Sequence, residues 1–531
     1  MNHPAFATHL VLILAASFAL NASSVLISGD ESSRDLVFSR RIDELIEEKL
    51  REQGTAPVEL CDDATFMRRL CLDLTGKNPT SGEVVAFLRD HDPQKRTALI
   101  DRLLRSPSCA VHLANTWSAW LLPEMQEIGP PNGRNGLHMW LRNRFADNLR
   151  YDRLVADLMV ASGSASSGPG SFFISLEGKP EKIAAKTARV FLGVQLDCAE
   201  CHDHPFDHWK QRDFWGFAAY FARLSAEGMR TPGGMMEVID RAEGEVKLPN
   251  TEEVIAPQPL VLTGLSGIDS GTRRQQLTLW LTARENPYLA RAAVNRCWSI
   301  MFGRGLIEPV DDMRAIEMAS HPELLRELAH EFASSQFDLR HLLRTLANTQ
   351  AYQRAAAREP NTRPDARDLN SYAWMPAKPL TSHQLSACLQ QVARNVAGEQ
   401  SQAQADSLAR QLGKLRGDSS VATLGIVQAL VTLHSNQLAR VHREDESRLL
   451  QALTAPHLNA EKRIEWLFLS TLCRPPRGDE LSELLAIPSQ GSAPKSPLPS
   501  DDTAKKADSV PEWQSDLLWA LVNSTEFAMT P

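Results

Sequence analysis

Apolar residues recur every three or four positions along most of the chain, and charged residues lie between them. This spacing is typical of amphipathic helices, which turn one face toward a core. Asn, Asp and Pro residues at 78–80 and 92–93 separate the early segments. The pattern therefore predicts a mainly α-helical protein, with helices over residues 38–50, 64–74, 83–88, 96–104, 180–192 and 513–522.

Two more helices are predicted from the residues that start them. Ser320 and Glu323 have the spacing of a capping box, with Pro322 in the first turn, and Thr381 and Gln384 have the same spacing. In a capping box, each of the two side chains accepts a hydrogen bond from the other residue's backbone N–H. We therefore expect one helix to begin just after Ser320 and another just after Thr381.

The helical pattern stops between about residues 226 and 271, where Gly, Pro and β-branched residues become frequent. We expect an irregular linker or a small set of short strands over residues 226–275. It would join a helical domain at 38–225 to a second helical domain at 276–531. Residues 488–510 are rich in Ser, Pro, Lys and Asp, which predicts a mobile loop inside the second domain.

Composition excludes one class of partner. The 531 residues are 43% hydrophobic and 23% charged, enough for a sizeable core in two to four domains. The net charge is -8, and acidic and basic residues are interspersed. Because no basic stripe with interleaved aromatic residues occurs, we expect no nucleic-acid partner.

The N-terminus resembles an export signal. Residues 10–20 form an apolar run of signal-peptide length, and small residues at 22–24 favour cleavage after Ser24. Lys and Arg are absent before this run, which leaves an uncleaved membrane anchor as the alternative. We therefore expect an exported protein of the periplasm or cell envelope, with residues 1–24 as signal peptide.

The most specific motif is C-x-x-C-H at residues 198–202. Two thiols at this spacing can add to the two vinyl groups of one haem, and the next residue is then placed to bind the iron. The motif predicts haem c attached through Cys198 and Cys201, with His202 as the proximal ligand. Export favours this interpretation, because a free C-x-x-C outside the cytoplasm would tend to form a disulfide. The other cysteines have no framework spacing, so we expect buried thiols, with a Cys61–Cys71 bridge left open.

Other chemistries remain open for the same segment. The two thiols can form a disulfide, a redox pair or half of a metal site. Residues His202, Asp203, His204 and Asp207 offer imidazoles and carboxylates that can bind iron or zinc without haem. The alternative function is therefore a non-haem metal-binding or structural interaction protein of the cell envelope.

Residues around the motif have two interpretations each. Met229, Met235 and Met236 are candidates for a distal haem ligand or are ordinary linker residues. Aromatic residues can line a haem or belong to the core: Phe191, Phe206, Trp209, Phe214 and Trp215. A polar cluster in an apolar context predicts either buried ion pairs between helices or a ligand site: Asn295, Arg296, Arg304, Glu308, Asp311 and Asp312.

Several long segments together resemble one family of exported planctomycete proteins. FMRRLCLDLTG at 66–76 and VFLGVQL at 190–196, followed by the C-x-x-C-H segment, resemble its cytochrome-like domain of unknown function. NPYLARAAVNR at 286–296, FGRGLIEPVDD at 302–312 and LWALVNSTEF at 518–527 resemble its planctomycete-specific C-terminal domain. The resemblance covers nearly the whole chain after the signal.

The resemblance implies a protein of unknown function that is called cytochrome-like because of the C-x-x-C-H motif. Many family members have an additional N-terminal cytochrome domain, for which we expect no room before Phe38. We therefore expect electron transfer to a redox partner on another chain, with membrane or envelope association open. Motifs such as G-x-S-x-G and H-E-x-x-H do not occur, and whether the protein is an enzyme stays open.

Overall fold

The computed structural model describes residues 36–122, 132–164, 168–227, 237–261, 271–313, 316–356, 370–393, 447–489 and 511–531. These residues are mainly helical, which confirms the predicted fold class. The expected signal at 1–24 and most of the expected loop at 488–510 lie outside them. Among the described residues, no helix combines the length and apolar character needed to cross a membrane.

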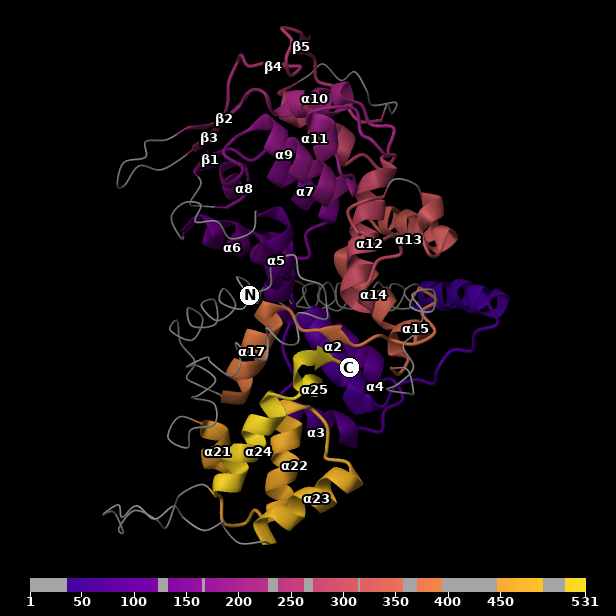
Figure 1. The fold of residues 1–531 in the computed structure, drawn as a ribbon, viewed down its shortest axis with the longest axis vertical. Coiled ribbons are helices and arrows are strands. Elements are labelled where there is room, and N and C mark those ends of the chain that lie inside the picture. The colour runs from indigo at the N-terminus through magenta and orange to yellow at the C-terminus, as the bar shows by residue number, and fades with distance from the viewer. Residues whose placement is uncertain are drawn as a thin grey trace, which may run out of the picture.

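Figure 1 shows the helices in groups along the longest axis of the molecule. One end holds α5 (Pro107–Leu121), α6 (Asn132–Ala146), α7 (Tyr151–Met159), α8 (Gly170–Ser175), α9 (Pro180–Thr187), α10 (Gln211–Ala218) and α11 (Arg273–Leu281). Beside it lie α12 (Pro287–Phe302), α13 (Pro322–Ser334), α14 (Leu339–Ala347) and α15 (Gln350–Gln353).

The other end brings together an early and a late part of the described chain. It combines α2 (Asp63–Thr75), α3 (Ser81–Arg89) and α4 (Lys95–Leu104) with α17 (Ser382–Ala393), α21 (Arg448–Leu453), α22 (Ala460–Thr471), α23 (Gly478–Ser489), α24 (Glu512–Val522) and α25 (Thr525–Ala528). A further helix spans residues 36–52. Each helix predicted from apolar spacing is therefore present.

Short strands occupy the predicted segment between the two helical parts. In one sheet, β3 (Glu237–Asp240) lies antiparallel between β1 (Gly163–Ser164) and β2 (Leu224–Glu227), with Gly163 opposite Val238 and Leu224 opposite Asp240. Strands β4 (Val246–Lys247) and β5 (Val254–Ile255) form a second antiparallel pair. A third pair joins β6 (Lys378–Pro379) to β7 (Met529–Thr530) near the C-terminus.

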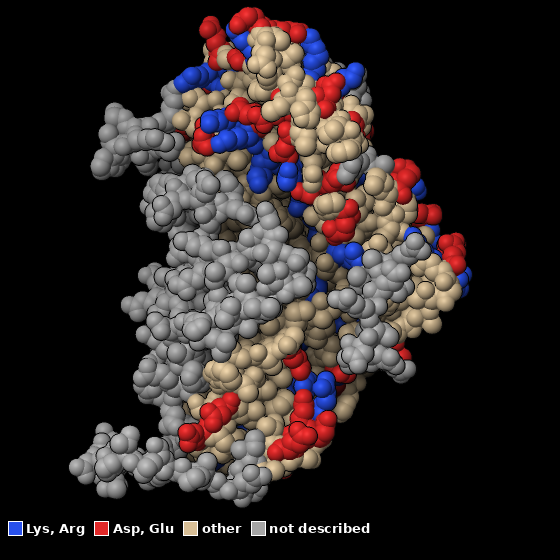
Figure 2. All heavy atoms as spheres, viewed as in Figure 1, with Lys and Arg blue, Asp and Glu red and all other residues tan. Residues whose placement is uncertain are grey.

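Two large hydrophobic cores among the described residues hold these groups together, and a third, small one contains Ala219, Val246 and Ile255. The larger core includes residues on both sides of the strand segment, such as Phe191 and Trp298. The smaller core joins Leu72 of α2 to residues between Leu380 and Phe527. Helix α2 thus lies against the C-terminal part of the chain. On the face that Figure 2 shows, acidic and basic side chains lie interspersed, as expected for solvated helix surfaces.

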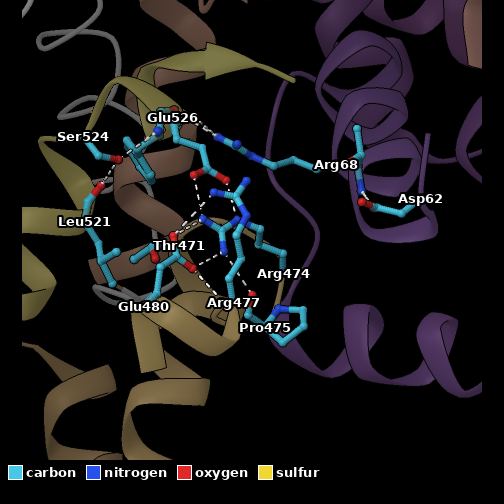
Figure 3. A network of polar contacts seen from close by, with 12 residues as sticks. Asp62, Arg68, Thr471, Arg474, Pro475, Arg477, Glu480, Leu521, Ser524 and Glu526 are labelled. Atoms are coloured by element: carbon cyan, nitrogen blue, oxygen red, sulfur yellow. Dashed lines mark hydrogen bonds and ion pairs between the residues drawn. The ribbon is translucent and has the colours of Figure 1, made fainter. Parts of the chain in front are cut away.

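Arg68 and Arg69 of α2 connect this helix to the C-terminal residues of the chain. Arg68 Nη2 donates to the carbonyls of Glu526 (2.8 Å) and Phe527 (3.1 Å), while Arg69 Nε donates to the carbonyl of Pro531 (2.8 Å). Next to them, Arg474 forms ion pairs with Glu480 (2.7 Å) and Glu526 (2.6 Å), as Figure 3 shows. These guanidinium groups fasten α2 and the segment after α22 to the C-terminal residues.

A buried histidine beside α2 makes stability depend on pH. His112 of α5 is buried, and a Cβ added to Gly76 would lie 2.5 Å from its Nδ1. Burial lowers the pKa of His112 from 6.5 to about 4. Between pH 6.5 and pH 4, His112 therefore binds a proton in the unfolded chain but not in the folded protein. The free energy of unfolding decreases as the pH falls through that range. The expected loss is on the order of 3 kcal/mol.

The measurement is the urea midpoint of unfolding at pH 7 and pH 4.5. His112→Gln should lose much of the difference between the two midpoints, and His330→Gln, at an exposed position, should keep it. An equal pH dependence in both variants would contradict a role for His112.

Candidate cofactor site

The segment that leads into the C-x-x-C-H motif begins as a regular helix and ends as a π-helical turn. Helix α9 starts at Pro180 and continues into the turn η2 (Ala188–Leu192). Gly193 then ends the helix with φ 66°, a left-handed conformation that favours glycine. Single π-helical turns within helices occur frequently at functional sites. The predicted helix over 180–192 is confirmed, although its last turn is wider than an α-helix.

The motif itself lies on the surface of the molecule. Cys198 is in the 3₁₀ turn η3 (Asp197–Glu200), and Cys201 directly follows it. Both cysteines and His202 are exposed, whereas Ala199 between them is fully buried and anchors the turn. Both thiols are free. The structure therefore presents the three predicted attachment residues together on one short turn.

The other six cysteines are free and buried, as predicted: Cys61, Cys71, Cys109, Cys297, Cys388 and Cys473. The open Cys61–Cys71 bridge is not formed. Burial raises the pKa of Cys109, Cys297 and Cys473 to about 12, so these thiols stay protonated at neutral pH. Because the thiolate is the reactive form, they are inert thiols in the folded protein.

Side chains of helix α10 hold the motif by donating hydrogen bonds to the motif's backbone carbonyls. Gln211 Nε2 donates to the carbonyls of Glu200 (3.1 Å) and Cys201 (2.9 Å), and Trp215 Nε1 donates to that of Glu200 (3.0 Å). The backbone N–H of Gln211 also donates to Asp203 Oδ1 at 2.9 Å. These contacts fix the main chain of the turn and leave the two thiols facing solvent.

The geometry of His202 fits a metal ligand. Its Nδ1 lies 2.8 Å from the backbone carbonyl of Asp203. A carbonyl oxygen only accepts hydrogen bonds, so Nδ1 donates to it, and in the neutral ring Nε2 then has the lone pair. A histidine that binds iron through Nε2 commonly donates its other N–H in this way. The residues present therefore fit a haem attached at Cys198 and Cys201.

The residues of the alternative metal site each have a local hydrogen bond. His204 Nδ1 accepts from the backbone N–H of Phe206 (3.2 Å), and Asp207 Oδ1 lies 2.6 Å from His208 Nδ1. Asp203 accepts from Gln211, as above. Across the described part of the chain, no group of three or more His, Cys, Asp or Glu side chains is placed to hold a metal ion.

The aromatic residues near the motif differ in how far they are buried. Phe191 and Phe214 are fully buried and Trp209 is 4% exposed, so these three belong to the core. Trp215 is partly buried and bonds to the turn. Phe206 is 80% exposed, four residues after His202. The three candidate distal ligands, Met229, Met235 and Met236, lie outside the described residues.

Sequence reasoning missed the role of Gln211 and the hydrogen bond of Trp215. Gln211 is the first residue of α10, and Trp215 lies one turn later. Their closeness in sequence to the motif is the feature that could have indicated these contacts. A capping contact of this helix supports the same placement, because Asp213 accepts from the backbone N–H of Lys210 at 2.9 Å. The start of α10 thereby faces the motif.

Comparison with known families divides the chain into two matched parts. Residues 41–226 match the family PSCyt2, described as a protein of unknown function (DUF1549). Residues 273–419 match the family PSD1, described as a protein of unknown function (DUF1553). No curated protein and no solved structure matches the chain. The motif lies inside the first matched part.

Proposed function

We propose that this chain, which contains a DUF1549 domain followed by a DUF1553 domain, is an exported c-type haem protein that transfers electrons. One observation supports this most directly. Two free, exposed thiols stand on a single turn, followed by a histidine whose Nδ1 lies against a backbone carbonyl, which leaves Nε2 of the neutral ring available to a metal. When bound, haem would supply a one-electron redox centre.

Each residue of the motif then has a defined task. Cys198 and Cys201 would provide the sulfur atoms of the two thioether bonds, and His202 would bind the iron through Nε2. The carbonyl of Asp203 holds the His202 ring in the required tautomer. Gln211 and Trp215 keep the turn in place. Phe206 offers an exposed apolar ring beside the motif that can cover part of a flat apolar ligand.

Surface exposure of the motif favours electron exchange with another protein. The thiols and His202 face solvent, so a ligand attached there would have an edge near the surface. The redox partner would accordingly be a separate chain that docks over this turn. Export to the periplasm or cell envelope and the planctomycete, cytochrome-like character of the family belong to the same proposal, since they rest on sequence resemblance.

The electron-transfer role is tested by a spectroelectrochemical titration of protein produced in a host with haem-c maturation machinery. The proposal predicts a reversible one-electron couple followed through the visible haem bands. A colourless protein, or one whose haem bands do not respond reversibly to the applied potential, would contradict electron transfer. A pyridine haemochrome assay together with metal analysis of the same sample separates haem iron from the non-haem iron or zinc alternative.

A further inference from the structure

The turn that leads into the motif is fastened by residues of the DUF1553 domain. Arg296 of α12 donates through Nη2 to the carbonyl of Arg189 (2.8 Å) and through Nε to the carbonyl of Val190 (3.2 Å). Both carbonyls belong to the π-helical turn η2. At the end of a helix such carbonyls have no partner within the helix, and the guanidinium group supplies one. The contact spans 106 residues of sequence.

The Arg296 guanidinium is itself fixed in place. Its side chain is buried, with 4% of the residue exposed, and it lies over the Trp120 ring at 4.8 Å from the ring centre. A planar guanidinium on an aromatic face, with two carbonyl acceptors at its edge, has little freedom to reorient. Lys has one ammonium group in place of this fork, so Lys cannot make the same set of contacts.

Two more residues of the same domain hold the next part of the turn. Asp311 Oδ1 accepts from Gln195 Nε2 at 3.1 Å, and Asp311 Oδ2 lies 3.5 Å from Arg189 Nη1. The backbone N–H of Met313 donates to the carbonyl of Gly193 at 2.7 Å. The Met313 side chain fills the space above Gly193, where an added Cβ would meet its Cε at 2.4 Å.

The last link reaches the motif directly. Arg189, which pairs with Asp311, also pairs with Asp197, and Asp197 is the residue before Cys198. A continuous set of contacts therefore joins α12 and the segment after it to the first cysteine. Within the polar cluster predicted at 295–312, Arg296 thus donates to backbone carbonyls of the first domain, and Asp311 forms an ion pair with Arg189 of that domain.

We infer that Arg296 and Asp311 are positioning residues, through which the DUF1553 domain holds the Cys198–His202 turn and sets the charge around the ligand bound there. The inference rests on the proposed haem site. It assigns the second domain a task that neither family description states. Asp311 neutralises part of the Arg189 charge near Cys198, so removal of this carboxylate should favour the reduced, less positive state of a bound haem.

The experiment compares three full-length variants by two readouts. Hydrogen exchange of peptides covering residues 189–202 reports on the turn with or without haem. The midpoint potential reports on the charge around the haem. Arg296→Gln should speed the exchange of these amides roughly tenfold, because two carbonyls lose a charged donor. Asp311→Asn should shift the potential to a higher value. Asp516→Asn makes the same change at an exposed position on α24 and should alter neither readout.

The outcomes separate the inference from the proposed function. A wild-type protein without haem would end the proposed function, and the exchange data would still decide whether Arg296 holds the turn. Unchanged exchange in Arg296→Gln would overturn the positioning role. In a haem-containing protein, faster exchange with a potential unchanged in Asp311→Asn would overturn the electrostatic role, since it would leave a purely structural contact.

Discussion

Replacing Cys198 and Cys201 together by Ala should remove all covalently attached haem from the protein. These are the two exposed thiols of the described chain, and the six remaining thiols are buried. Burial also keeps the buried thiols protonated, for example Cys388, whose pKa is raised to about 11. No other pair is thus available to react with the vinyl groups. The measurement is the intact mass of the denatured protein, together with its visible spectrum.

A matched control uses two of the buried thiols. Cys109→Ala/Cys388→Ala removes the same number of sulfur atoms from core positions and should keep the haem-sized mass increase. Circular dichroism melting of both double variants shows whether each is folded. Haem still covalently bound to a folded Cys198→Ala/Cys201→Ala protein would contradict the proposed attachment.

Lys378→Met should destabilise the protein by about 3–5 kcal/mol, because it leaves a buried carboxylate without its cation. Lys378 Nζ lies 2.6 Å from Asp73 Oδ1 and donates to the carbonyls of Ile300 (3.0 Å) and Met301 (2.8 Å). Asp73 also accepts from the Tyr352 hydroxyl at 2.9 Å. Burial raises the pKa of Asp73 despite the ammonium group beside it.

The measurement is the free energy of unfolding in urea. Lys462→Met, on the surface of α22, removes a lysine whose side chain is 56% exposed and should change stability by less than about 1 kcal/mol. Adding Asp73→Leu to Lys378→Met should restore much of the loss, since neither charge of the pair then remains. Equal stability of the Lys378→Met and Lys462→Met proteins would show that the buried pair contributes little.

Local signals predicted some helix starts and failed at others for a physical reason. At Thr381 the capping box forms, with Gln384 Oε1 accepting at 2.8 Å and Thr381 Oγ1 accepting at 3.2 Å. Near Ser320 the predicted helix is present with Pro322 in its first turn, but the capping box does not form. Helix α13 begins at Pro322 with His321 before it, and the Ser320 hydroxyl lies 3.2 Å from His321 Nδ1. The Ser320 backbone N–H donates to the carbonyl of Leu306 at 2.7 Å, so a tertiary contact replaces the local one.

Long-range contacts could not be predicted because their partners are far apart in sequence. The spacing of apolar residues indicated the helix over 180–192, but nothing in that spacing marks its π-helical last turn. The motif at 198–202 indicated its own residues, whereas the segment that leads into it is contacted by Arg296 and Asp311 about one hundred residues later. Arg69 likewise meets the carbonyl of Pro531, 462 residues away. One sequence shows which residues are unusual, and the fold decides what they contact.

The most direct test of the account is whether the wild-type protein contains covalent haem at this turn. The measurement is a pyridine haemochrome spectrum with intact mass spectrometry, on protein exported from a host with haem-c maturation machinery. The account predicts a c-type band and a haem-sized mass increase that survives denaturation. A protein without haem that holds a stoichiometric metal ion, or a Cys198–Cys201 disulfide, would contradict it.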